Sequence, residues 1–123
     1  EVLVKIQDPL LALHDIYIVQ EILGTKVEGD SLTKVPTMEM FVSERRIAGT
    51  DGCNNYFASI ETLTETNITF STAGSTRMLC PNMTTPDLFS EALSDVQTYS
   101  RGNGQVMLMN SSGETAILLK KVD

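Results

Sequence analysis

The sequence is poor in the residues from which metal sites and catalytic centres are built, with two cysteines and one histidine in 123 residues. A structural zinc ion takes four Cys or His ligands, usually in close pairs, so no metal site is expected. A catalytic cysteine needs a neighbouring base that holds it as a thiolate. The one histidine, His14, lies in an apolar run far along the chain from Cys53 and Cys80. We therefore expect no catalytic residue, no metal and no cofactor, and a protein that is not an enzyme.

Positive charge and long apolar runs are also scarce. Nine Lys and Arg residues stand against 16 Asp and Glu residues, which gives a formal net charge of −7. Nucleic-acid binding relies on clustered basic side chains that displace phosphate counterions, so no nucleic-acid partner is expected. No apolar run approaches the roughly 18 to 20 residues that cross a bilayer, which argues against a membrane span. The stretch GTDG at 49–52 lacks the Gly-Lys-Ser/Thr ending of a phosphate-binding loop, so nucleotide binding is not expected either.

The length and composition are those of one folded domain that spans residues 1–123. Hydrophobic residues make up 41% of the chain and charged residues 20%, as in an ordinary globular protein. A chain of this length can bury roughly two thirds of its unfolded surface around a single core. We expect a monomer.

Short segments with β-branched, aromatic or alternating apolar residues recur along the chain and are separated by polar turns. This spacing is typical of a protein made mostly of short strands. A strand covered on both faces is predicted at 15–22, and a hairpin is predicted from strands at 37–42 and 46–48. Further strands are predicted at 1–7, 54–60, 67–70, 77–79, 105–110 and 115–121, with a turn at 111–114.

One segment, at about 86–98, has instead the pattern of an amphipathic helix. Thr85 is suited to cap its N-terminus and Pro86 to occupy its first position. The apolar stripe comprises Leu88, Phe89, Ala92, Leu93 and Val96, and the residues assigned to water are Ser90, Glu91, Ser94 and Asp95. Because strands surround this segment in the sequence, its stripe should cover a sheet face or close the open end of a barrel. The predicted fold class is therefore mainly β, with one helix in an α+β domain.

The cysteines Cys53 and Cys80 leave two structural interpretations open. A disulfide requires an oxidising compartment and close approach of the two Cα atoms. It would close a loop of about 28 residues and stabilise the fold by about 3.5 kcal/mol in the loop-entropy description. Alternatively, each cysteine is a free thiol, buried separately as a small hydrophobic residue.

The stretch around Cys53 predicts a tight corner. Gly52 permits a positive φ or a close backbone approach, and the Asn54 side chain can satisfy backbone amides at such a corner. A second interpretation is a polar pocket beside the cysteines, formed by Asn54, Asn55, Tyr56 and Arg77. The nearby acids Asp51, Glu61 and Glu65 are interpreted as solvated groups rather than paired carboxylates.

Methionines occur as two pairs with a spacing of two, Met38 with Met40 and Met107 with Met109. In a strand, this spacing places both members of a pair on one face. Flexible thioethers fill gaps in a core, and this is the first interpretation. The alternative is an apolar cavity, lined by these four residues in a partly open barrel, that accepts a lipid tail or an apolar segment of a partner.

These motifs together resemble the META domain, the HslJ-like proteins of bacteria. The resemblance covers about residues 36–122 and rests on a GCN tripeptide, a T-x-M-x-C segment, a helical stripe and a closing hairpin. The matching residues are Gly52, Cys53, Asn54, Tyr56, Thr76, Met78, Cys80, Phe89, Leu93, Val96, Leu108, Gly113 and Leu118. The family usually opens with a strand that carries a Trp, and here the segment 14–24, without Trp, takes that place.

The resemblance implies a small antiparallel, lipocalin-like or partly open β-barrel with one helix, in which Cys53 and Cys80 are bridged. It also implies an exported protein of the bacterial periplasm, of the outer membrane as a lipoprotein, or of the cell surface. No enzyme activity is established for the family, which is loosely associated with heat-shock response, antibiotic tolerance and virulence. The start at Glu1, without an initiator methionine, fits a mature form that was preceded by an export signal or a lipid anchor.

The expected function is thus a non-enzymatic, stress-related binding module with an unknown protein partner. The alternative is a carrier that holds a small apolar ligand or a lipid inside the barrel.

Overall fold

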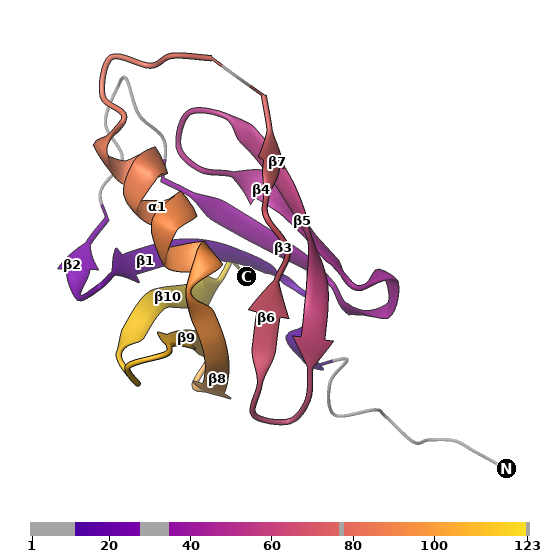
Figure 1. The fold of residues 1–123 in the computed structure, drawn as a ribbon. Helices are drawn as coiled ribbons and strands as arrows, with labels where there is room; N and C mark the ends of the chain where they lie inside the picture. Colours follow the sequence, from indigo (N-terminus) through magenta and orange to yellow (C-terminus); the bar gives the residue numbers. More distant parts are fainter. Residues whose placement is uncertain (1–11, 28–34, 77, 123) are drawn as a thin grey trace, which may run out of the picture.

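The computed structural model describes residues 12–27, 35–76 and 78–122, which form strands and one α-helix in the arrangement of Figure 1. The helix α1 spans Thr84–Ser94, and a short 3₁₀ helix spans Val42–Glu44. The strands are β1 (Ile16–Ile22), β2 (Thr25–Lys26), β3 (Thr37–Phe41), β4 (Arg46–Thr50), β5 (Asn55–Leu63), β6 (Ile68–Phe70), β7 (Gly74–Ser75), β8 (Val96–Gly102), β9 (Gln105–Asn110) and β10 (Thr115–Lys121).

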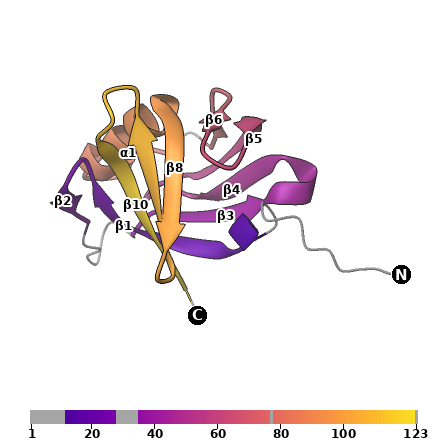
Figure 2. The same ribbon diagram turned by 90° about the horizontal axis from the view of Figure 1, so that it is seen from below.

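The strands form one antiparallel sheet in the order β6-β5-β4-β3-β1-β10-β9-β8, with β2 beside β1 and β7 beside β5. The two ends of this order meet, because Asn67 of the β5–β6 turn forms an isolated bridge with Thr98 of β8. The backbone N–H of Tyr99 donates to the carbonyl of Thr66 at 2.9 Å, and its hydroxyl donates to the carbonyl of Thr64 at 2.6 Å. The sheet therefore curls into a nearly closed barrel, seen from below in Figure 2. The predicted fold class is confirmed.

The interior of the barrel is filled by side chains. Alternation along each strand sends every second residue inward, so that Met38 and Met40 of β3 are wholly buried while Glu39 between them is only half-buried. The buried residues form one core cluster, whose largest fully buried members are Tyr17, Phe89, Leu13, Met38, Met40, Ile47, Ile68, Leu108, Ile117 and Leu119. Such a core holds the strands together and occupies the barrel interior with side chains.

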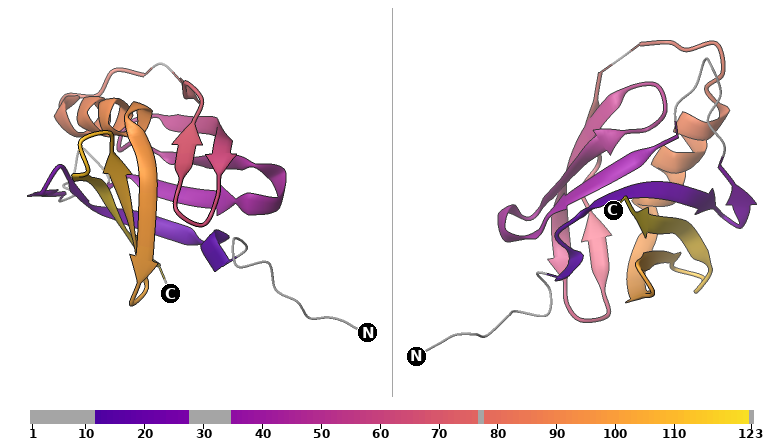
Figure 3. Two further views of the ribbon diagram at one scale, coloured as in Figure 1. Left: turned by 60° about the horizontal axis from the view of Figure 1, so that its bottom comes forward. Right: turned by 180° about the vertical axis from the view of Figure 1, so that it is seen from behind.

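Helix α1 packs against one side of the barrel, where it contacts β10, β1 and β6. Phe89, Ala92 and Leu93 on its inner face are buried, whereas Leu88 is 38% exposed. The ring of Phe89 lies against the ring of Tyr56, with centroids 5.2 Å apart. Both views of Figure 3 show the helix running along the sheet and leading directly into β8.

The start of the helix differs from the prediction. The first helical residue is Thr84 and the capping position is Met83, so Thr85 is not the N-cap. The side chain of Asn82 takes part instead, because its Oδ1 accepts a hydrogen bond from the backbone N–H of Thr84 at 2.9 Å. Pro86 still lies in the first turn, where the N–H that it lacks would have no helical partner.

The end of the helix also differs, because residues 95–98 were predicted to be helical and are not. Helix α1 ends at Ser94, and Val96 begins β8, which pairs with β9 through Val96 with Asn110 and Thr98 with Met109. Without β8, strand β9 would be an unpaired edge with open backbone hydrogen-bonding groups. Pairing with the next strand along the chain thus prevails over the helical periodicity of Val96.

The full length of β8 was missed by the sequence interpretation, although the sequence contains a signal for it. Asn103 and Gly104 join β8 to β9 with φ of 54° and 74°. Two successive positive φ values are those of a type I′ turn, for which Asn-Gly is a preferred sequence.

The other predicted strands are confirmed as β1, β3, β4, β5, β6, β9 and β10, with ends shifted by a few residues. The strand predicted at 77–79 is wrong for its described residues, because Met78 and Leu79 are in no strand and are 58% and 90% exposed. The strand predicted at 1–7 lies outside the described residues.

Candidate functional site

The corner that follows β4 is organised by Asp51. Its Oδ1 accepts hydrogen bonds from the backbone N–H of Cys53 at 2.9 Å and of Asn54 at 2.7 Å. Asp is suited to this role because its side chain bonds its own backbone two residues on. Gly52, inside the turn, has a φ of 105°, which explains why a glycine precedes Cys53.

Asn54 joins this corner to the segment that precedes the helix. Its Oδ1 accepts from the N–H of Met78 at 2.7 Å and from the hydroxyl of Thr76 at 2.9 Å, while its Nδ2 donates to the carbonyl of Met78 at 3.0 Å. The amide side chain thus bonds both backbone groups of Met78, as a neighbouring strand would. This is why residues 78 and 79 need no strand partner.

The disulfide reinforces the same connection. Cys53 and Cys80 are bonded, with Cα atoms 6.0 Å apart. The bridge expected from the resemblance is confirmed, and the interpretation of two separate free thiols is wrong. The link joins the two segments covalently beside the hydrogen bonds of Asn54.

Replacing Asn54 with alanine is expected to lower the free energy of unfolding by about 2 kcal/mol, because three hydrogen bonds of about 1 kcal/mol each are lost and water replaces part of them. The matched control is Asn55→Ala, which alters the adjacent, exposed side chain and should stay within about 0.5 kcal/mol. Urea unfolding of both variants measures the difference. Equal stability of the two variants would show that Asn54 does not hold the corner.

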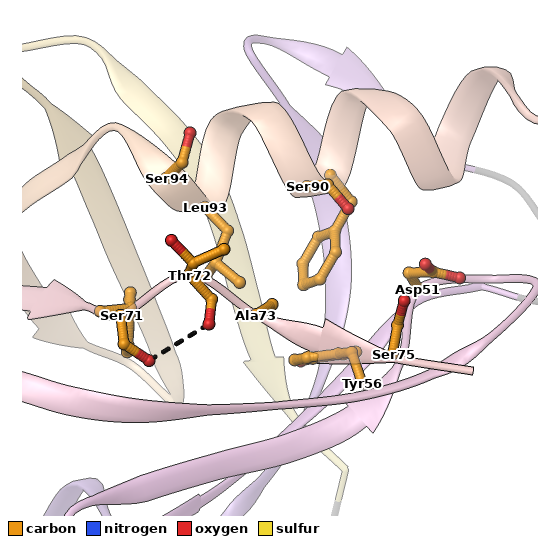
Figure 4. A pocket seen from close by; sticks show the side chains of 11 residues that line it. Asp51, Tyr56, Ser71, Thr72, Ala73, Ser75, Ser90, Leu93 and Ser94 are labelled. Carbon is orange, nitrogen blue, oxygen red and sulfur yellow. Dashed lines mark hydrogen bonds between the residues drawn. The ribbon is translucent and has the colours of Figure 1, made fainter. Parts of the chain in front are cut away.

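A pocket of about 240 Å³ lies beside this corner, between α1 and the sheet (Figure 4). The sheet contributes Tyr56 of β5, and the segment after β6 contributes Ser71, Thr72 and Ala73. The helix contributes Phe89, Ser90, Leu93 and Ser94, with Phe70, Ser75 and Asp51 completing the lining. Figure 4 shows Asp51 and Ser75 close together at one end, with Ser71, Thr72 and Ser94 towards the other.

Strand β7 forms part of this lining through its pairing with β5, in which Ser75 faces Tyr56 and Gly74 faces Phe57. A Cβ on Gly74 would lie 2.6 Å from the Phe57 ring, so a larger residue there would displace this exposed side chain. The close pairing places the Ser75 side chain at the pocket.

Asp51 is buried, with only 6% of its surface exposed, and is the one charged residue among the described residues that line the pocket. The sequence interpretation of this residue as a solvated acid is therefore wrong. The two backbone hydrogen bonds to Oδ1 hold this carboxylate in the corner.

Tyr56 stays neutral in this setting. Burial raises the pKa of its phenol, and the nearby negative charge of Asp51 raises that pKa further. The Tyr56 hydroxyl donates to the carbonyl of Thr37 at 2.7 Å, so its ring presents an apolar wall to the pocket while its polar end is satisfied.

Of the residues predicted to form a polar pocket, the three that the structure describes do not line one pocket. Asn54 is buried in the corner and Tyr56 lines the pocket just described, but Asn55 is exposed on the opposite face of β5. Arg77 lies outside the described residues. Alternation along β5 separates Asn55 from Tyr56, since neighbouring residues of a strand point to opposite faces.

The four methionines do not share a cavity either. Met38 and Met40 belong to the core, whereas Met107 is 37% exposed and lies on the outer face of β9 with Met109. The inward positions of β9 are taken by Val106 and Leu108.

The other titratable candidates lie apart from the pocket. His14 is exposed with its ring against Phe41, and Glu61 and Glu65 are exposed as expected. Within the described ranges, no cluster of three or more His, Cys, Asp or Glu residues could hold a metal ion. No helix in the same ranges has the length and apolar character that a bilayer crossing requires.

Sequence reasoning missed the hydroxyl groups of the pocket. Ser90 and Ser94 are exposed as expected, and because they are four residues apart they share the side of α1 that borders the pocket. The run STAGS at 71–75 consists of small residues, which leave room between a strand and a helix. Neither signal indicates by itself that the two segments face each other.

Together, the fold and this site define a class of protein: a small antiparallel barrel with a filled interior, one packed helix, a disulfide-tied corner and a lateral pocket. The chain belongs to the META domain family, whose family model matches residues 11–123.

Two solved structures share the fold. One NMR structure is 22% identical in sequence, with a TM-score of 0.66, and the match covers 90% of this chain and 92% of the other. A second, of a protein from Burkholderia xenovorans, is 19% identical with a TM-score of 0.63, and the match covers 98% and 94%. A search of curated protein sequences finds no match.

Proposed function

We propose that this META domain is a non-enzymatic binding module that works outside the cytoplasm and holds a small ligand in the pocket between α1 and β5. The observation that carries the proposal is the construction of the pocket on a covalently tied corner. The Cys53–Cys80 bridge and the Asn54 hydrogen bonds hold the sheet side, and buried Phe89 and Leu93 hold the helix side. Walls fixed in this way reduce the entropy that a ligand must overcome on binding.

The disulfide supports the proposed location. Disulfides persist in oxidising compartments and are rare in the cytosol, so the bridge fits an extracellular or envelope protein. In the proposal, the protein works in the bacterial periplasm, on the outer membrane as a lipoprotein, or at the cell surface.

The chemistry of the pocket supports binding rather than catalysis. A nucleophilic hydroxyl needs a base within hydrogen-bond reach. Among the described lining residues, the Ser94 hydroxyl donates to the backbone carbonyl of Glu91 and the Ser71 hydroxyl to that of Thr72. None of the lining hydroxyls in the described ranges donates to Asp51.

The filled interior argues against transport of a lipid inside the barrel. The positions at which a carrier would hold an acyl chain are occupied by core residues such as Tyr17, Met40 and Leu108. The lateral pocket is therefore the site to which we assign the ligand.

An NMR screen with small polar fragments tests the proposal. At least one fragment should shift the amide resonances of Tyr56, Ser75 and Ser90 in a saturable manner. Ser90→Leu should abolish these shifts, because its side chain fills the pocket, whereas Ser43→Leu alters an exposed site outside the lining and should leave them unchanged. If no fragment gives saturable shifts that depend on Ser90, the pocket is not a binding site.

A further inference from the structure

Asp51 has one carboxylate oxygen whose role the fold does not explain. Oδ1 accepts the two backbone hydrogen bonds of the corner, but no donor among the described residues bonds to Oδ2. The side chain is 6% exposed and lies at one end of the pocket lining, as Figure 4 shows. A carboxylate has about four lone-pair sites, so the two hydrogen bonds at Oδ1 leave Oδ2 able to accept further donors.

The protein does not supply the missing positive charge within its described ranges. The two ion pairs there are Arg46 with Glu44 and Lys121 with Asp15, and none of these residues lines the pocket. Water in the pocket can bond to Oδ2 in the free protein, and a ligand cation that donates hydrogen bonds would form a stronger, charge-assisted bond there.

The surroundings of Asp51 favour an ammonium group over a metal ion. Calcium binds six to eight oxygen ligands and usually several carboxylates. The pocket offers one carboxylate, the hydroxyls of Ser75 and Ser90, and the aromatic side chains of Tyr56 and Phe89. Aromatic rings attract organic cations and pack against apolar groups, and hydroxyl oxygens accept hydrogen bonds from N–H donors.

The volume limits the size of the ligand. A space of 240 Å³ holds about eight water molecules at about 30 Å³ each. A ligand with about ten non-hydrogen atoms is therefore the largest that fits within the walls.

We propose that the pocket binds a small primary amine, with the protonated nitrogen at Asp51 Oδ2 and the apolar part of the molecule against Tyr56 and Phe89. This inference rests on the proposed function and specifies the ligand of that same site.

Titration with benzylamine, monitored by NMR in phosphate buffer at pH 7, tests the inference. Tris is excluded because it is itself an amine. Benzylamine should shift the resonances of Asp51, Ser75 and Ser90 with a dissociation constant of about 1 mM, a value within reach of so small a ligand. Benzyl alcohol, which has the same shape without the charge, should bind at least about tenfold more weakly, because the charge-assisted hydrogen bond is lost.

Asp51→Asn should also lower the affinity for benzylamine by at least about tenfold. The Oδ1 of the new asparagine still accepts the two corner hydrogen bonds, so the fold should be preserved. The matched control is Glu61→Gln, which removes an exposed charge from β5 and should change the affinity less than about twofold. Ser90→Leu, which retains the charge and fills the space, should abolish binding.

Three outcomes would overturn the inference: benzylamine affinity unchanged in Asp51→Asn, equal affinity for benzyl alcohol, or absence of saturation below about 20 mM. Saturable shifts of Asp51 with Mg²⁺ or Ca²⁺ at lower concentrations would also overturn it and indicate a metal site. If only a neutral or anionic fragment binds, and its binding depends on Ser90, the proposed amine ligand would be wrong while the proposed binding function would stand. If no fragment of any charge binds in a manner that depends on Ser90, both the proposed amine ligand and the proposed binding function would be wrong.

Discussion

Replacing Phe89 with alanine is expected to lower the free energy of unfolding by about 4 kcal/mol, the range for removal of a buried aromatic side chain. Phe89 is 1% exposed and joins the helix to the core through its contact with the Tyr56 ring. The substitution removes the apolar area and leaves a cavity that the barrel cannot close, because both flanking walls are held by other contacts. Urea unfolding, monitored by far-UV circular dichroism, measures the loss.

The neighbouring residue provides the control for this prediction. Leu88 lies on the same helix and is 38% exposed, so Leu88→Ala should cost less than about 1 kcal/mol. Both variants introduce alanine into the same helix, so their difference reports burial rather than helix propensity. Similar losses in the two variants would contradict the packing of α1 described above.

Removal of the disulfide by the double substitution Cys53→Ala and Cys80→Ala is expected to cost about 3.5 kcal/mol. The bridge spans a sequence separation of 27 residues and thereby restricts the unfolded chain. In a domain of this size, the loss corresponds to a decrease of about 10 to 15 °C in Tm. Thermal unfolding with and without a reductant measures it.

The double variant also serves as the control for the reductant, which should lower the Tm of the wild type and leave that of the variant unchanged. The intact mass of the denatured wild type should rise by about 2 Da on reduction, because two hydrogens are added. A wild-type Tm that is insensitive to complete reduction would contradict a stabilising role of the bridge.

The two predictions concern different parts of the same pocket. Phe89 holds the helix side and the disulfide holds the corner on the sheet side. If the pocket is a binding site, both changes should also weaken ligand binding, since each loosens a wall. Asp51→Asn should weaken binding of an amine without such a loss of stability. This difference distinguishes a residue that contacts the ligand from residues that stabilise the pocket walls.

Several features could be predicted because their causes are local. Alternating apolar residues and turn residues indicated the hairpin at 37–48 and the strands at 105–110 and 115–121. Such patterns are local, because successive side chains of a strand point to opposite faces. The resemblance to the META family implied the bridge between Cys53 and Cys80, while the residues alone left separate free thiols open. Asn103-Gly104 would have indicated β8 by the same local reasoning had it been weighed against the helical pattern.

Other features depend on distant contacts and could not be inferred. Val96 fits the helical stripe, yet it begins β8 because β9 needs a partner. Asp51 resembles any surface acid in the sequence, and its burial is evident only in the folded corner, where it closes the turn and lines the pocket beside α1.

The sequence by itself determined a mostly β domain, because alternation and turn residues are local, and its motifs carried the resemblance to the META family that implied the cysteine bridge. Only the tertiary structure decided where the helix ends, which side chains line the pocket and that one carboxylate is enclosed there. The pocket lining and the burial of Asp51 are set by segments far apart in the sequence, such as Asp51 and Ser90, and the end of the helix is set by the pairing of Val96 with Asn110.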